Sequence, residues 1–212
     1  MTQNPDAPGD EPAWKQRAVD RSTRAARIRA EQRVQRFLDA AQLIIAEKGT
    51  TEFTVQEVVD RSRQSLRSFY QHFDGKHELL LALFEDALRR ATDQIAAAAA
   101  GHADPVEALK TAVHLLFELS RPDPSARRPL FTDVAPRLML SHPAEVRRAR
   151  APLLDLLTEL TRGVADAGQL RASLEPGRAA ALTMETVMFA APGTSASADE
   201  IWDFCSRGIV AA

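Results

Sequence analysis

The apolar residues of this 212-residue chain recur at intervals of three and four along most of its length. This spacing places them on one face of an α-helix, and no segment alternates with period two for long enough to form a strand. The pattern therefore predicts an all-α fold of about nine helices without a sheet. The expected helices cover about residues 34–48, 54–61, 65–73, 76–100, 105 to beyond 117, short pieces within 124–140, 143–168, 176–191 and 198–211.

Several helix ends carry clear sequence signals. Thr54 and Glu57 form a Thr-x-x-Glu capping box, and Ser65 is placed to cap the short helix that follows. Gly49 stands where a helix ends in a left-handed residue, and Gly75 interrupts the chain before the next long helix. These signals give two short helices joined by about three residues, which is a helix–turn–helix spacing.

The net charge of −2 conceals an uneven distribution along the chain. Residues 1–14 carry −3, residues 15–76 carry +5 and residues 77–212 carry −4. A basic segment joined to an acidic body is typical of a nucleic-acid-binding module attached to a second unit. A solvated helix surface gives the same imbalance, so charge alone leaves both interpretations open.

Composition disfavours several functional classes. No stretch has the roughly 18 apolar residues of a membrane-spanning helix, and the first thirty residues lack the apolar segment of a secretory signal. Cys205 is the single cysteine, which excludes an internal disulfide framework and favours a reducing cytoplasm. The five histidines form no pair at helical metal-site spacing, and neither a phosphate-binding glycine loop nor a nucleophile elbow is present. We therefore expect a non-enzymatic cytoplasmic protein without a metal or cofactor.

The helix–turn–helix spacing is the feature that carries chemistry. An α-helix fits the major groove of DNA, where its exposed side chains meet base edges. Arg67 can donate two hydrogen bonds to guanine, and Gln71 can pair with adenine at two positions. Two ordinary core helices whose polar faces meet water are the alternative. The candidates for base contact are Ser65, Leu66, Arg67, Ser68, Gln71 and His72, and those for phosphate contact are Tyr70 and Lys76.

Residues 33–84 resemble the DNA-binding domain of the TetR family of bacterial repressors. The resemblance is carried by Phe37-Leu38-Asp39-Ala40-Ala41, Glu47-Lys48-Gly49, Thr54-Val55, Glu57-Val58-Val59-Asp60-Arg61, Ser65-x-x-Ser68-Phe69-Tyr70-x-x-Phe73 and Lys76-x-Glu78-Leu79-Leu80. By position, it implies that Thr54, Tyr70 and Lys76 contact the DNA backbone. It also implies that residues 65–68, 71 and 72 form the base-reading face.

The turn departs from the family's pattern. Where Ala-Gly-Val is common, this chain has Ser62-Arg63-Gln64. Without glycine, either the turn needs no left-handed residue or Arg63 adopts that conformation under strain. Gln64 replaces a small apolar residue, so Arg63 and Gln64 are both candidate DNA contacts whose roles the sequence leaves open.

An arginine-rich stretch precedes the first expected helix. We expect it to reach the minor groove or the phosphates, as in family members with long N-terminal extensions, although a solvated tail that aids solubility is the alternative. The arm residues are Arg21, Arg24, Arg27 and Arg29. The predicted domains are a disordered tail with this basic arm over 1–30, a helix–turn–helix DNA-binding domain over 31–76, and a helical effector-binding and dimerisation domain over 77–212.

For the body, the resemblance implies a small-molecule effector and a homodimer formed through the last two helices. A largely apolar effector of unknown identity would occupy a cavity among the long helices, although a filled core explains the same residues. The candidate pocket residues are Phe84, His114, Phe117, Phe131, Met139, Met184 and Met188. The predicted function is a homodimeric regulator, a repressor released from a palindromic double-stranded DNA operator by its effector. A helical protein–protein adaptor and a DNA-binding factor without an effector are the alternatives.

Overall fold

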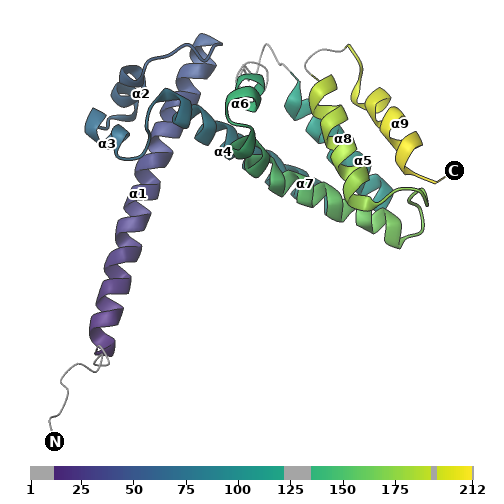
Figure 1. Ribbon diagram of the computed structural model, residues 1–212, viewed down its shortest axis with the longest axis horizontal. Coiled ribbons are helices and arrows are strands. Elements are labelled where there is room, and N and C mark those ends of the chain that lie inside the picture. Colours follow the sequence, from purple (N-terminus) through teal and green to yellow (C-terminus); the bar gives the residue numbers. More distant parts are fainter. Residues whose placement is uncertain (1–11, 122–134, 192–194, 212) are drawn as a thin grey trace, which may run out of the picture.

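The computed structural model describes residues 12–121, 135–191 and 195–211 (Figure 1). Its helices are α1 (Ala13–Lys48), α2 (Val55–Ser62), α3 (Leu66–Tyr70), α4 (Lys76–Ala99), α5 (Pro105–Ser120), α6 (Ala135–Ser141), α7 (Pro143–Asp166), α8 (Pro176–Ala190) and α9 (Ala198–Ile209). Of the pieces expected within 124–140, α6 is described, and residues 124–134 lie outside the described residues. The all-α fold is confirmed, and within the described ranges no helix is long and apolar enough to cross a membrane.

The helix starts are built as the capping signals predict. The Thr54 hydroxyl accepts a hydrogen bond from the backbone N–H of Glu57 at 3.2 Å, and the Glu57 carboxylate accepts one from the N–H of Thr54 at 2.7 Å. The Ser65 hydroxyl accepts from the N–H of Ser68 at 3.0 Å. Gly49 ends α1 with a φ of 66°. These local bonds set where α2 and α3 begin without help from distant parts of the chain.

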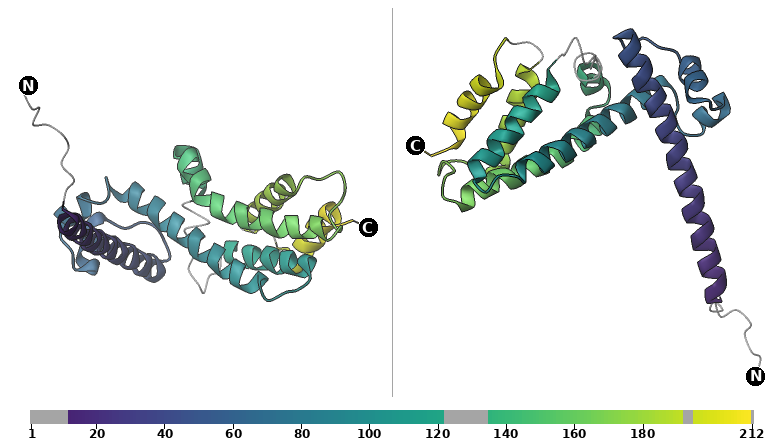
Figure 2. Two further views of the ribbon diagram at one scale, coloured as in Figure 1. Left: turned by 90° about the horizontal axis from the view of Figure 1, so that it is seen from below. Right: turned by 180° about the vertical axis from the view of Figure 1, so that it is seen from behind.

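The helices form two units that α4 joins (Figures 1 and 2). The C-terminal half of α1 packs with α2, α3 and the start of α4. Helices α5 and α7 pack on α4, and α8 and α9 lie at the far end of the molecule. One continuous apolar core extends from Phe37 in α1 to Ile209 in α9. Because α4 belongs to both units, it is the mechanical link between them.

The N-terminal basic stretch differs from its prediction. Residues 13–30, which were predicted as the basic arm of the tail, form the first part of α1, while residues 1–11 lie outside the described residues. No core holds this stretch, because the first fully buried side chain of α1 is that of Phe37. It continues a helix whose later turns are packed, so the costly nucleation step is already made, and its alanines and arginines favour the helical conformation.

Candidate nucleic-acid interface

Three aromatic rings hold α3 against the rest of the N-terminal unit. The ring of Phe69 in α3 meets that of Phe37 in α1 edge-on, with centroids 5.4 Å apart. The Phe73 ring, just beyond α3, lies 5.3 Å from that of Phe69 and 6.1 Å from that of Phe37 between centroids. All three side chains are buried. Because these rings fix one side of a five-residue helix, the opposite side faces outward.

The turn between α2 and α3 keeps a left-handed residue although it lacks glycine. Arg63 has φ 53° and ψ 37°, and within the described ranges no other non-glycine residue has a positive φ. Its N–H donates to the carbonyl of Asp60 at 3.3 Å, and the N–H of Gln64 donates to the carbonyl of Val59 at 3.3 Å. Of the two possibilities that the sequence left open, the structure shows that Arg63 adopts the left-handed conformation. This conformation costs about 1 kcal/mol. Arg63 is exposed, whereas Gln64 is half-buried.

The outward side of α3 is polar apart from Leu66. Arg67 and Gln71 are exposed and four residues apart, so their side chains lie on the same side of the helix. Neither side chain has a hydrogen-bond or ion-pair partner among the residues described, which leaves the guanidinium and the carboxamide available to a ligand. Ser65 and Leu66 are exposed beside them.

Ser68 and His72 do not lie on this exposed side, contrary to their prediction. Both residues are half-buried, and the Oγ of Ser68 and the Nε2 of His72 are buried with no hydrogen-bond partner in the described part of the chain. Each directly precedes a buried ring, that of Phe69 or Phe73, and so shares the inward half of the helix. Base contact by either residue would require these atoms to turn outward.

The three candidates for phosphate contact stand at helix ends. Tyr70 is the last residue of α3, and Thr54 caps α2, whose first N–H groups favour an anion. Both are exposed. Lys76 opens α4, and its Nζ lies 4.8 Å from the centroid of the Phe53 ring and 3.9 Å from a carboxylate oxygen of Glu52. A cation and two hydroxyl groups are therefore presented by α3 and its neighbours in the chain.

An ion pair ties the start of α2 to the end of α1. The ammonium group of Lys48 contacts the carboxylate of Glu57, which also accepts the hydrogen bond from the N–H of Thr54. The Lys48 contact and then the Thr54 bond lower the pKa of Glu57 to about 2. The carboxylate that closes this capping box is therefore ionised at any pH near neutrality.

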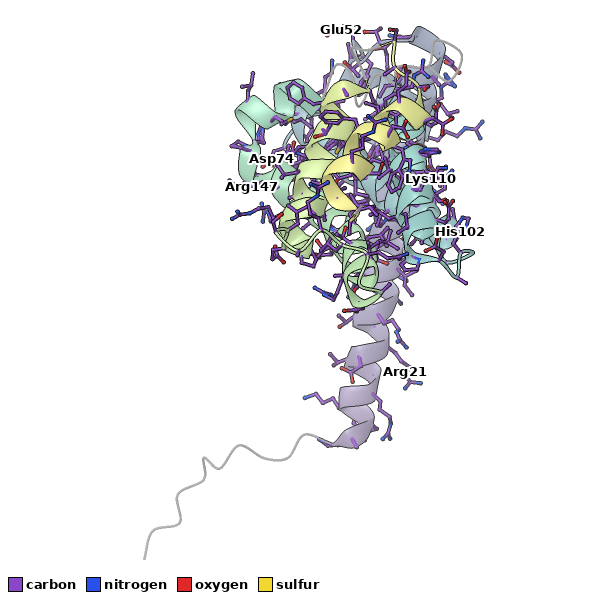
Figure 3. All side chains as sticks on the ribbon, turned by 90° about the vertical axis from the view of Figure 1, so that its right-hand side faces the viewer. Arg21, Glu52, Asp74, His102, Lys110 and Arg147 are labelled. Atoms are coloured by element: carbon purple, nitrogen blue, oxygen red, sulfur yellow. The ribbon has the colours of Figure 1, made fainter. Side chains whose placement is uncertain are left out.

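The four arm candidates are all exposed on the first part of α1. Figure 3 shows Arg21 on the stretch of α1 that stands clear of the other helices. The Nε of Arg27 donates to the carboxylate of Glu31, one turn further on, at 2.7 Å. Arg17 lies one turn before Arg21 on the same side of the helix. Arg17 was not among the predicted arm residues, although its spacing of four from Arg21 can be read from the sequence.

The sequence of this helix–turn–helix segment matches a known protein family. Residues 37–83 match the sequence profile of bacterial regulatory proteins of the tetR family, and this segment contains α2, the turn and α3. The N-terminal unit of this chain is therefore a TetR-family DNA-binding domain. This match makes the chain a DNA-binding transcriptional regulator, and related regulators of the family are not enzymes. No curated protein matches the sequence.

Solved structures share the fold over more than four fifths of this TetR-family chain. The fatty acid degradation regulator FadR from Bacillus halodurans is 19% identical, with a TM-score of 0.64 over 82% of this chain and 92% of its own. FadR from Bacillus subtilis, solved in complex with stearoyl-CoA, is 15% identical, with a TM-score of 0.60 over 82% and 98%. SmeT, the repressor of a Stenotrophomonas maltophilia multidrug efflux pump, is 21% identical, with a TM-score of 0.60 over 84% and 90%.

The residues predicted to line an effector pocket of this TetR-family protein do not gather around one described cavity. Phe84, Phe117 and Met184 are buried core residues of α4, α5 and α8. The Nε2 of His114 lies 3.5 Å from a carboxylate oxygen of Asp199. Met139 is exposed on α6, and the sulfur of Met188 accepts a hydrogen bond from Arg150 at 3.4 Å. Phe131 lies outside the described residues, so the pocket stays a prediction.

The far end of the body has an exposed apolar surface that the sequence did not single out. Leu182, Phe189 and Phe204 of α8 and α9 are 60%, 80% and 70% exposed. A groove of about 700 Å³ between the two helices is lined by Leu182 and Phe204 and also by Cys205. Burial raises the pKa of the Cys205 thiol, which stays protonated near neutrality. No periodic signal marks Phe204, because apolar residues occur on more than one side of α9.

A charged pair lies among these apolar residues. Glu185 of α8 stands between Leu182 and Phe189 at helical spacing, and its carboxylate forms an ion pair with the buried Arg150 of α7, with 2.9 Å between nitrogen and oxygen. The Nε of Arg150 is buried and has no hydrogen-bond partner among the described residues. A buried guanidinium needs its partner, so this pair fixes the position of α8 on α7.

Proposed function

We propose that this chain is a homodimeric repressor that leaves a palindromic DNA operator when a small, largely apolar molecule binds its body. The observation that carries the proposal is the exposed, unpartnered pair Arg67 and Gln71 on α3, a helix held outward by buried rings. In the major groove, Arg67 would donate to guanine and Gln71 would pair with adenine. Tyr70, Thr54 and Lys76 would bind phosphates and fix the register of the helix.

Dimerisation would use the exposed apolar surface of α8 and α9. Rings that are 70–80% exposed are costly in water, and a second copy of the same surface would cover them through a two-fold axis. Two copies of α3 would then meet half-sites about 10 base pairs apart, or a multiple of that distance. The operator is therefore expected to be a palindrome.

Release by an effector is a shift between two arrangements of the dimer. A ligand lowers operator affinity only by as much as it favours the arrangement in which the two copies of α3 no longer fit the half-sites. Helix α4 is the element that would transmit the change, because it belongs to both units. The complex of Bacillus subtilis FadR with stearoyl-CoA supports a ligand with a large apolar part for the shared fold.

The test is a gel-shift titration of the full-length protein against the DNA upstream of its own gene, at several salt concentrations. Specific retardation that is lost in Arg67→Ala and Gln71→Ala variants supports the proposal, whereas retention of both variants on that DNA contradicts it. A chain that binds a protein partner but no DNA would be an adaptor. Release of the bound DNA by stearoyl-CoA, or by a test ligand that is largely apolar, supports an effector. A complex that no ligand dissociates favours a DNA-binding factor without an effector.

A further inference from the structure

We propose that Arg150 binds an anionic group of the effector, a carboxylate or a phosphate on an apolar molecule, and that this group displaces the carboxylate of Glu185. The inference deepens the proposed function, on which it rests, because it names the chemistry of the ligand that would release the operator. It also connects ligand binding to α8, the helix that carries part of the proposed dimer surface.

Arg150 lies on the side of α7 that faces the core. The buried side of this helix runs through Val146, Arg150 and Leu153 at intervals of four and three, and Arg150 is only 9% exposed. The two other arginines of this part of α7, Arg147 and Arg148, are exposed. A charged side chain buried to this extent is costly unless each of its polar groups finds a partner.

The partners of the Arg150 guanidinium are incomplete. Its Nη2 lies 2.9 Å from a carboxylate oxygen of Glu185 and donates to the sulfur of Met188 at 3.4 Å. Its Nε is buried and has no hydrogen-bond partner within the described ranges. A guanidinium can present two parallel N–H groups, from Nε and Nη2, to the two oxygens of one anion. An oxyanion that binds both nitrogens would therefore satisfy the Nε that Glu185 leaves without a partner.

Glu185 can leave the pair more easily than Arg150 can. The side chain of Glu185 is 52% exposed, whereas that of Arg150 is 11% exposed. A half-exposed carboxylate recovers its hydration when it turns into water, but a buried guanidinium left behind needs another anion. The pair is therefore suited to an exchange in which a second anion takes the place of Glu185.

The methionines of α8 indicate the apolar part of the ligand. The sulfur of Met188 contacts the guanidinium, and Met184, one turn earlier, is buried in the core. Methionine side chains are flexible and adapt their packing to apolar groups of different shapes. A ligand anchored at Arg150 would place its apolar part between α7 and α8 as these side chains move. A neutral molecule would leave the buried charge unmatched.

Loss of the Arg150–Glu185 pair would act on the proposed dimer surface. Glu185 lies three residues after Leu182 and four before Phe189, and both of these apolar side chains are exposed on α8. Helices α7 and α8 pack against each other (Figure 1), and the pair is one of the contacts that join them. A ligand that displaces Glu185 removes this contact, so α8 can shift on α7 and change the arrangement of the dimer.

The experiment compares ligands that share an apolar chain and differ in their head group. Octanoate, octyl phosphate and neutral octanamide are titrated into the full-length protein without DNA, and isothermal titration calorimetry measures the affinities. Benzoate and benzamide extend the comparison to an apolar ring. We expect at least one anion to bind at least about tenfold more tightly than the amide that shares its apolar part. Tighter binding of octyl phosphate assigns the site to phosphate esters, and tighter binding of octanoate or benzoate assigns it to carboxylic acids.

Two variants of Arg150 test whether this residue receives the anion. Arg150→Met removes the cation and keeps an apolar side chain of similar length, so it should abolish the preference for anions over amides. Arg147→Met is the matched control, because it removes an exposed arginine from the same helix and should leave the preference unchanged. Circular dichroism checks that each variant is folded. If Arg150→Met does not fold, Arg150→Lys keeps the charge without the planar fork and should reduce the preference at least about tenfold.

A variant of Glu185 tests the exchange itself. Glu185→Gln removes the competing charge and keeps an oxygen that accepts from the guanidinium, so it should tighten anion binding by about tenfold. Glu159→Gln is the matched control, because it neutralises an exposed carboxylate on α7 and should have no effect. A pair that only holds α8 in place predicts the opposite result, since loosening α8 does not favour an anion over an amide.

Several outcomes would overturn the inference. No measurable anion binding, equal affinities for anions and amides, or an unchanged preference in the Arg150 variants would make Arg150 a purely structural cation. Unchanged or weaker anion binding by Glu185→Gln would show that Glu185 does not occupy the ligand's place. A gel shift separates the two proposals. If octanamide releases the DNA as well as octanoate does, the effector stands and its anionic group does not. If the anions bind through Arg150 but the protein retards no DNA, the operator function alone fails.

Discussion

The two outward surfaces of this protein are built in opposite ways. On α3 most exposed side chains are polar, and several of the groups that position them lie close in sequence, such as the Ser65 cap and the left-handed Arg63. On α8 and α9 the exposed side chains are large and apolar, namely Phe189 and Phe204. Their positions depend on helices α5 and α7, which come from earlier parts of the chain.

This difference separates two kinds of binding. A polar surface is stable in water, so α3 can stay exposed when no ligand is bound. An exposed aromatic ring loses the stabilisation of burial, about 25 cal/mol for each square ångström that stays in water. The surface on α8 and α9 is therefore suited to a lasting contact with a second copy, and the surface on α3 to a reversible one.

The largest expected effect comes from the ring that supports α3. Phe69→Ala removes a fully buried side chain and should lower the free energy of unfolding by about 3–5 kcal/mol. Urea unfolding followed by circular dichroism measures the loss. Phe204→Ala is the matched control, because it deletes the same ring from a position that is exposed in the single chain. At a protein concentration low enough to keep the chain monomeric, it should change the free energy of unfolding by less than about 1 kcal/mol. Equal losses in the two variants would refute the distinction between a buried support and an exposed contact.

The next effect concerns the second surface. Phe204→Asp places a charge in the apolar groove and should weaken self-association by about 2 kcal/mol or more, which is about thirtyfold in the dissociation constant. Sedimentation velocity over a range of concentrations measures it. The helix content should not change, because the ring is exposed within a single chain. An unchanged association constant would show that this surface is not where two copies meet.

A smaller effect separates base reading from phosphate contact on α3. Gln71→Ala should weaken binding by about 1–3 kcal/mol on sites that carry the preferred base and should relax the preference at that position. Tyr70→Ala should instead weaken every site by a similar factor. A panel of duplexes with single base-pair changes measures both. Uniform losses in the Gln71 variant would contradict its assignment as a base contact.

The parts of the fold that were predicted from the sequence are those decided within a few residues. The capping bonds of Thr54 with Glu57 and of Ser65 with Ser68 join groups three positions apart, so the residue pattern alone locates the starts of α2 and α3. The breaks around Gly49 and the proline-led starts of the long helices follow for the same reason. Periodicity then supplies the core-facing side of each long helix.

The parts that were missed depend on contacts between distant segments. Whether Ser68 and His72 face inward is decided by how the ring of Phe37 packs against Phe69, and the spacing within α3 does not show it. On α9, Trp202 is buried and Phe204 is exposed, although both are aromatic and two positions apart. The helix over residues 13–30 could not be assigned from periodicity, because this stretch has no apolar side.

The pH dependence of stability tests the capping-box carboxylate of Glu57 in the N-terminal unit. The pKa of Glu57 falls from an ordinary value of 4.5 to about 2 on folding, so its ionised carboxylate stabilises the folded state above pH 4.5. This contribution is lost as the pH falls through about 2. Glu57→Gln should therefore lower the unfolding temperature at neutral pH, by an amount that shrinks between pH 4.5 and 2. A difference that stays constant with pH would show that the carboxylate's charge has no part in it, and added salt should reduce the difference because the group is exposed.

The smallest effect concerns the left-handed backbone of Arg63, and tests whether it lowers the stability of the fold while placing the Arg63 side chain. Arg63→Gly removes the cost of the left-handed conformation in the folded state, about 1 kcal/mol. Glycine also increases the conformational entropy of the unfolded chain, so the free energy of unfolding should rise by only about 0.5 kcal/mol. Arg63→Ala is the control, because it removes the same side chain and keeps the strained backbone. The difference between their urea midpoints measures the backbone effect alone. If both variants lose operator affinity equally while only the glycine variant gains stability, the side chain of Arg63 contacts DNA and the strain is the consequence of placing it there. If the alanine variant keeps full affinity, Arg63 serves the turn and not the DNA.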